Sequence, residues 1–234
     1  MNRRNAALAA LTVTILSAEP AMAEQLLWSV KAEQVEYRLG DESNLLAWDA
    51  GAQIGTDELK FVYRTEGEFK TSGDVLERLE NHFRAQMPIS TFFDVVGGIR
   101  VDLPEGPDRV HGIFGLHGLA PQWFEVDADF FVSDHPSFRL EVDYEALITN
   151  HLILTPSLEF DLPFTDDRPL DIGAWGPKVE VGLRLSYDLI DHRLVSPYVG
   201  VHYERVFGET RNIVRAEGKD DDAFYAVAGL RVLF

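Results

Sequence analysis

Histidine and carboxylate side chains share the polar positions of several stretches in which polar and apolar residues alternate. Together, imidazole and carboxylate groups can bind a divalent transition-metal ion. The chain has no cysteine, which excludes thiolate metal sites, disulfides and a cysteine nucleophile. The candidate ligands are His82, His111, His117, Glu125, Asp127 and His202. For each histidine the alternative is a structural role, and we expect His135, His151 and His192, which fall in predicted connections, to be solvated.

The elements that must position these side chains have a period of two. Apolar residues alternate with polar ones over residues 124–132, 138–146, 158–162 and 179–188. Such alternation predicts β-strands with one apolar and one polar face. The apolar face lines the interior of a soluble barrel, but it covers the outside of a membrane-spanning barrel. Strand number, strand length and loop length must therefore decide between the two.

The chain divides into twelve candidate strands, most of them as long as a tilted membrane-spanning strand of about ten residues. The longest connections all follow odd-numbered strands, and the turns after even-numbered strands are short. This pattern predicts an all-β fold, a transmembrane antiparallel up-and-down β-barrel. Residues 75–87 also fit an amphipathic helix, because their apolar residues recur every four positions. The predicted strands are 29–38, 45–54, 59–69, 75–87, 91–102, 110–119, 123–132, 138–148, 152–163, 178–189, 196–207 and 223–234.

The N-terminal segment has the layout of a secretory signal peptide. Arg3 and Arg4 precede a mostly apolar stretch, residues 6–16, and Ala21 and Ala23 flank Met22 in a small-residue cleavage site. We expect a cleaved signal peptide at 1–23 and an outer-membrane β-barrel domain at 24–234, with a buried N-terminal helix as the alternative. The formal net charge of −18 excludes nucleic acid as a partner. Export and a barrel together predict the bacterial outer membrane and contact with its lipid.

If the apolar faces contact lipid, the strand histidines point into the lumen. On residues 110–119, outward Phe114 and Leu116 place the two histidines of that strand inside. The next strand presents Glu125 and Asp127 to the same lumen, so two imidazoles and one or two carboxylates predict a metal site there. The competing interpretation is a lumen filled by ion pairs between acidic residues and the inward arginines Arg64, Arg100, Arg139, Arg184 and Arg231.

An ordered set of short motifs runs through the chain. The longest is the Gly118–Ala128 run, GLAPQWFEVDA, and the last strand ends on the aromatic Phe234. The others lie at residues 27–31, 33–37, 48–50, 65–68, 183–187, 197–201, 204–208 and 215–218. From about Leu27 to Phe234 the chain resembles the copper resistance protein B family of bacterial outer-membrane barrels. The resemblance implies copper ions and periplasmic copper-resistance proteins as partners.

The chain departs from that family in one respect. Members often carry a flexible segment rich in Met and His before the barrel, but here only residues 24–27 separate the predicted cleavage site from Trp28. Met87 is the one methionine beyond position 23. Because thioether ligands favour Cu(I), we expect imidazole and carboxylate ligands and Cu(II) rather than Cu(I).

The expected function is that of an outer-membrane β-barrel in a copper resistance system. It would bind copper ions or let them cross the outer membrane through a narrow, acidic, His-containing lumen. The alternative is a generic small cation-selective or structural barrel with no specific metal site, and a soluble periplasmic barrel is a third possibility. We expect no enzymatic activity, because a barrel lipase would need a serine and a histidine on the lipid-facing surface.

Overall fold

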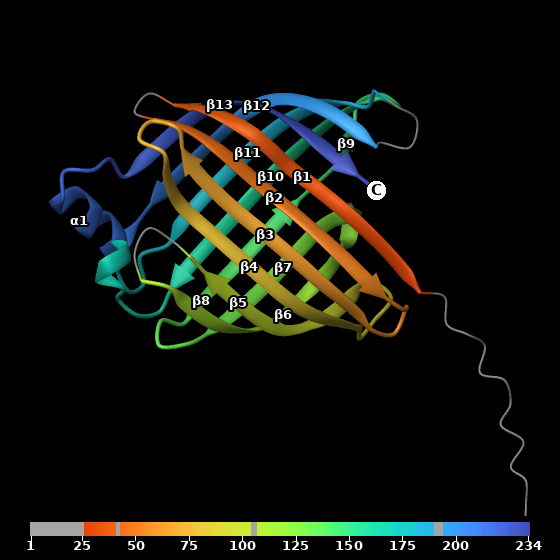
Figure 1. The fold of residues 1–234 in the computed structure, drawn as a ribbon, viewed down its shortest axis with the longest axis horizontal. Helices are drawn as coiled ribbons and strands as arrows, with labels where there is room; N and C mark the ends of the chain where they lie inside the picture. The colour runs from red at the N-terminus through yellow and green to blue at the C-terminus, as the bar shows by residue number, and fades with distance from the viewer. Residues whose placement is uncertain (1–25, 41–42, 104–106, 190–193) are drawn as a thin grey trace, which may run out of the picture.

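The computed structural model describes residues 26–40, 43–103, 107–189 and 194–234. The predicted signal peptide, residues 1–23, lies outside them. The strands form one antiparallel sheet in which sequence neighbours pair, and β1 pairs with β13 to close it (Figure 1). The strands are β1 Leu27–Gly40, β2 Asn44–Gly55, β3 Lys60–Lys70, β4 Val75–Pro88, β5 Phe93–Asp102, β6 Arg109–Ala120, β7 Phe124–Val132, β8 Ser137–Asp143, β9 Ala146–Leu147, β10 Leu152–Pro163, β11 Lys178–Tyr187, β12 Val195–Val206 and β13 Asp222–Leu233.

The closed twelve-strand barrel predicted from the number and length of the strands and connections is confirmed, with β8 and β9 counted as one strand. Residues 75–88 form strand β4, so the helical alternative for this segment was wrong. The predicted strand 138–148 is interrupted, because it divides into β8 and the two-residue β9. Tyr144, at the break, donates its backbone N–H to the carbonyl of Pro156 in β10. Proline has no backbone N–H and cannot donate the reciprocal hydrogen bond, so the pairing of the two strands is interrupted there.

In the part of the chain that the structure describes, three helical segments lie between strands. The 3-10 turn η1, Pro121–Trp123, precedes β7, and a second one, η2, Arg168–Leu170, lies in the long connection before β11. The connection between β12 and β13, for which the sequence predicts no helix, contains helix α1, Gly208–Ala216. In Figure 1, α1 lies at one end of the barrel and the C-terminus at the other. We call these ends the loop end and the turn end.

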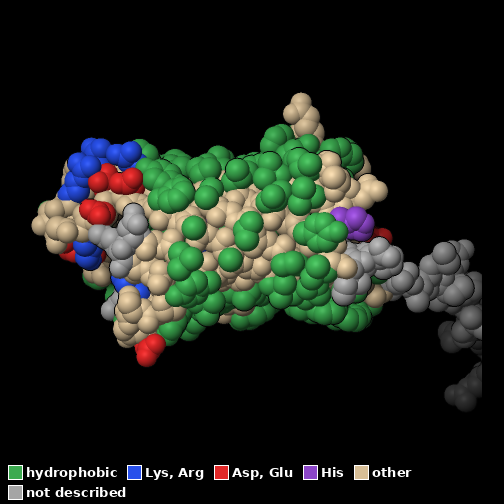
Figure 2. Space-filling view, turned by 90° about the horizontal axis from the view of Figure 1, so that it is seen from above, with side chains coloured by type: hydrophobic (Ala, Val, Ile, Leu, Met, Phe, Trp, Pro, Cys, Tyr) green, Lys and Arg blue, Asp and Glu red, His purple; other side chains and the backbone are tan. Residues whose placement is uncertain are grey.

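The outer wall of the barrel is apolar. Phe114 is 63% exposed while its neighbour Ile113 is 5% exposed, as expected if the first points outward and the second into the lumen. Figure 2 shows hydrophobic side chains over the wall and charged ones gathered near the loop end. Exposed Trp28, Trp123 and Phe234 lie near strand ends at the turn end, as in an interfacial aromatic girdle. No helix in the described ranges combines the length and apolar character needed to cross a bilayer.

Strand β1 keeps its polar face inward by means of a bulge. Its pairing with β13 slips between Ala32 and Val35, and its pairing with β2 slips at the same place. Even-numbered Trp28 and Val30 are exposed before the bulge, whereas odd-numbered Val35 and its successors are exposed after it. One extra residue thus reverses which positions face the lipid.

Candidate metal centre in the barrel lumen

Buried ion pairs fill much of the lumen. Arg100 binds Asp102 at 2.6 Å, Arg184 binds Glu36 at 2.8 Å, and Arg84 pairs with Asp129. The predicted arginine pairing is therefore present, and all five inward arginines named from the sequence contact carboxylates. Charges removed from water are tolerated when they are paired and hydrogen-bonded in this way.

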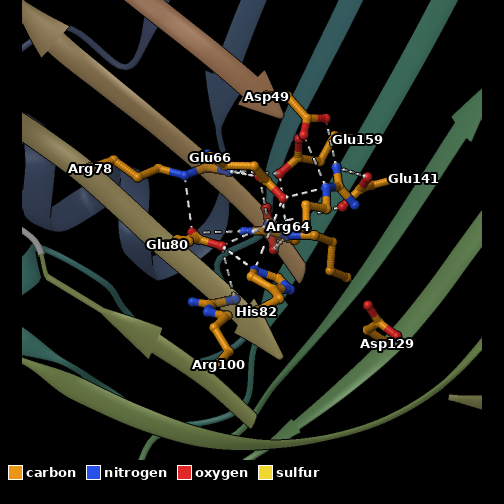
Figure 3. A network of polar contacts seen from close by, with 12 residues as sticks. Asp49, Arg64, Glu66, Arg78, Glu80, His82, Arg100, Asp129, Glu141 and Glu159 are labelled. Carbon is orange, nitrogen blue, oxygen red and sulfur yellow. Dashed lines mark hydrogen bonds and ion pairs between the residues drawn. The ribbon is translucent and has the colours of Figure 1, made fainter. Parts of the chain in front are cut away.

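Two groups of side chains in the described residues have the composition of a metal centre. The first, Glu66, Glu80 and His82, is fully buried near the middle of the lumen (Figure 3). Arg78 reaches both of its carboxylates, at 2.8 Å to Glu66 and 3.0 Å to Glu80, and Arg139 also reaches Glu66, at 3.4 Å. Arg64 approaches Glu66 to 2.8 Å, and Arg139 and Arg100 approach Glu80 to 3.0 and 3.5 Å. Four guanidinium groups therefore already compensate the two carboxylates.

The second group consists of Glu180 on β11 with His202 and Glu204 on β12, nearer the loop end. Glu180 and Glu204 are cross-strand partners, so both carboxylates face the lumen at one level. The Nε2 atom of His202 lies 3.2 Å from Glu180 Oε2, and His202 is 4% exposed. The Tyr225 hydroxyl donates to Glu204 Oε1 at 3.4 Å. One oxygen of each acid and one ring nitrogen lie within 4.8 Å of one another.

Gly182 helps to form this second group. It lies directly across from His202 in the β11–β12 pairing. A Cβ atom built there would lie 2.3 Å from both Arg184 Nη1 and Ser157 Oγ. Glycine therefore leaves room for the Arg184 guanidinium and the Ser157 hydroxyl, which a larger residue would displace.

The structure does not bring His111 and His117 into one centre. They are six residues apart on β6, roughly 20 Å along a strand. His111 Nε2 lies 3.2 Å from Asp102, and its Nδ1 lies 2.9 Å from Ser133 Oγ. His117 Nδ1 lies 3.0 Å from Asp127, its cross-strand partner. The predicted site with two imidazoles on this strand is therefore not formed.

Four acids of the two metal groups, Glu66, Glu80, Glu180 and Glu204, are absent from the ligands predicted from the sequence. They become ligand neighbours through strand pairing, Glu66 opposite Glu80 and Glu180 opposite Glu204. Alternation showed that each acid could face the lumen, but only the register between strands shows which acids share a level.

A cavity of about 210 Å³ occupies the lumen. Its wall includes His117, Glu125 and Asp127 from the turn end of the barrel, and Glu180 and His202 from the second metal group. Cations that enter this space meet carboxylates on several strands. An acidic, narrow lumen of this kind raises the local concentration of cations.

Loops and α1 pack together at the loop end. The buried hydroxyl of Thr210 donates to the carbonyl of Gly176 at 2.7 Å and accepts the N–H of Gly173 at 3.1 Å. Arg109 makes a two-point contact with Asp167 at 2.7 and 2.9 Å. The Thr210 contacts hold α1 against the long connection before β11, and the Arg109 contact joins that connection to the start of β6.

The fold and its charged lumen define an outer-membrane, porin-like β-barrel. Among solved structures it is similar to the NanC porin, with a TM-score of 0.55 and 11% identity over 88% of this chain and 99% of that one. The family described as copper resistance protein B precursor matches residues 26–234. The chain belongs to this family, as its motifs indicated, and the barrel lies in the outer membrane.

Two relatives support the family assignment. A copper resistance protein B homolog of Pseudomonas syringae pv. tomato is 34% identical over 205 residues, which cover 87% of this chain and 68% of the relative. Copper resistance protein B of Escherichia coli is 31% identical over 207 residues, which cover 88% of this chain and 69% of the relative. In both cases the alignment spans most of the barrel.

Proposed function

We propose that this barrel binds copper ions in its lumen and lets them cross the outer membrane, without catalysing a reaction. The observation that carries the proposal is the group formed by Glu180, His202 and Glu204 beside the acidic lumen cavity. Membership of the copper resistance protein B family supports copper as the ion. Two carboxylates and one imidazole provide a neutralising, mixed oxygen and nitrogen ligand set for a divalent ion.

The ligand types favour Cu(II) over Cu(I). Met87 is 52% exposed on the outer wall with outward-pointing Phe83, so its thioether does not face the lumen. No cysteine is present. Among divalent ions, an imidazole and carboxylate site binds Cu²⁺ more tightly than Zn²⁺, and Mg²⁺ prefers an all-oxygen octahedral shell.

The remaining predicted ligands lie outside the second metal group, and we assign them other roles in the lumen. His117, Asp127 and Glu125 border the cavity near the turn end. Short turns of such barrels face the periplasm, so an ion that arrives from periplasmic copper-resistance proteins, or leaves toward them, would pass these three residues first. His82 and His111 contact the ion-pair network, so we assign them a structural role in narrowing the lumen.

Calorimetric titration of Cu(II) into the detergent-folded barrel tests the proposal, with Zn(II) and Mg(II) for comparison. We expect one saturable, copper-preferring site that His202→Ala weakens at least about tenfold, the loss of one good ligand interaction. His151→Ala is the matched control, because His151 is an exposed residue of a turn. Vesicles containing the barrel should also admit Cu(II) faster than empty vesicles.

Two results would overturn the proposal. Absence of saturable copper binding above the zinc and magnesium background would leave a generic cation-selective or structural barrel. Equal copper affinity in the wild type and in His202→Ala would remove the second metal group as the site.

A further inference from the structure

One lysine occupies the space between the carboxylates of the second metal group. Lys178, the first residue of β11, places its Nζ atom 2.8 Å from Glu180 Oε1 and 2.7 Å from Glu204 Oε2. A single ammonium group thus bridges the two acids that would bind a metal ion. The nearest further cation is Arg78, whose Nη1 lies 3.7 Å from Glu180 Oε1.

The imidazole of the group is left without a comparable partner. His202 is 4% exposed, and its Nδ1 atom has no hydrogen-bond partner among the described residues. Its Nε2 atom lies 3.2 Å from Glu180 Oε2. A buried polar atom without a partner costs free energy, and such atoms in a native structure commonly mark a place for a missing ligand. The ammonium therefore satisfies the acids and leaves the histidine available.

We infer that Lys178 is a tethered competitor for the copper site, and that a copper ion binds by displacing its ammonium group. This inference rests on the proposed function, since it concerns the same three ligands. An ammonium and a divalent cation repel each other strongly at a few ångströms, so the two carboxylates hold one or the other. Only the metal ion can also coordinate the His202 nitrogen, which gives it an advantage that a monovalent cation lacks.

The side chain that must move is suited to exchange. Lysine carries a compact, strongly hydrated charge on a flexible stem, and the Lys178 side chain is 30% exposed. The Glu68 carboxylate is close enough to interact electrostatically with the ammonium, and it offers a position for the displaced charge. The first metal group lacks this freedom, because Arg64, Arg78 and Arg139 hold its acids through several buried contacts.

Competition by lysine would suit a barrel that passes ions. Conduction requires a site that binds strongly enough to admit an ion but weakly enough to release it. A resident ammonium lowers the apparent copper affinity in proportion to the fraction of molecules in which the site is free of it. It also returns to the carboxylates when the ion leaves, so the acids are never without a counter-charge.

Lys178→Met and Lys178→Gln remove the ammonium and test the inference by calorimetric titration with Cu(II). If the lysine-free state is populated at about a tenth or less, either substitution tightens copper binding at least about tenfold. Lys178→Arg retains the charge and should not tighten it. Lys60→Met is the matched control, because Lys60 also begins a strand and pairs with a carboxylate, Asp94 at 2.9 Å, near the turn end.

The outcomes separate the inference from the proposed function. Tighter binding in both neutral Lys178 variants but not in Lys60→Met supports tethered competition, including when the wild type itself binds copper too weakly to detect. Copper binding by the wild type that is unchanged or weaker in both folded neutral variants overturns the inference alone. Absence of copper binding in the wild type and in every variant overturns both. Retention of the heat-modifiable, folded band on a gel shows that each variant has formed the barrel.

Discussion

Replacement of Arg139 by methionine should destabilise the barrel more than any exposed charge removal. Arg139 is 4% exposed and reaches Asp161 at 2.8 Å, Glu80 at 3.0 Å and Glu159 at 3.3 Å. Methionine retains much of the length but none of the five N–H donors. Removing one partner of a buried ion pair leaves an uncompensated charge and costs about 3–5 kcal/mol. We expect a loss of this size in the free energy of unfolding.

Urea unfolding of the barrel in lipid vesicles, followed by tryptophan fluorescence, measures this loss. Arg168→Met is the matched control, because Arg168 is an exposed arginine that binds Asp166 at 3.1 Å, and an exposed pair contributes about 0–1 kcal/mol. Adding Asp161→Asn to Arg139→Met should recover part of the loss, because Arg139 is the cation that binds Asp161 and its removal strands that charge. If both arginine variants lose less than about 1 kcal/mol, lumen water screens the network and the reasoning fails.

Two further predictions concern the wall and the loop end. Leu183 lies at the middle of β11 on the lipid face, so Leu183→Lys should lower the free energy of unfolding in vesicles by about 2–4 kcal/mol. The control, Leu59→Lys in a turn, should lower it by about 0–1 kcal/mol, and equal losses in the two variants would contradict the membrane placement. The hydrogen bond from Arg215 lowers the pKa of the Asp221 carboxyl below its ordinary value of 3.8, so the charged form stabilises the segment after α1. That contribution is present above pH 3.8 and is lost as the pH falls through the lowered pKa. The protection of the α1 amides against hydrogen exchange, relative to the intrinsic exchange rate at each pH, should therefore fall in acid in the wild type but stay constant in Asp221→Asn.

The wall of the barrel could be predicted from the sequence because facing is a local property. Outward Phe114 and inward Ile113 follow from alternation within a single strand, and β4 follows the same rule although its apolar spacing also fits a helix. The bulge of β1 was not predicted, although the sequence contains its mark: the outward apolar positions change from even to odd numbers across the polar pair Glu33 and Gln34. The break before β9 depends on Pro156 of another strand, and therefore on pairing.

The candidate site was less accessible to sequence reasoning for the same physical reason. His111 and His117 share a face and therefore looked like one site, but strand rise separates residues on one strand rapidly. Ligands that do converge, such as Glu180 and Glu204, lie on two strands and meet through register. Because the register between strands is set by the whole closed sheet, it cannot be predicted from the residue pattern of a single strand.

The counter-ion, rather than the ligand set, distinguishes the two metal groups of the lumen. Each has one histidine and two glutamates, so composition alone assigns them the same chemistry. Glu66 and Glu80 are bound by arginines, whose planar guanidinium groups each offer several N–H donors. An entering ion would therefore have to break many buried contacts at once. A single ammonium holds Glu180 and Glu204, and it can leave along a flexible stem. If this difference is decisive, arginine substitutions should change stability and Lys178 substitutions should change copper affinity, and the reverse pattern would refute it.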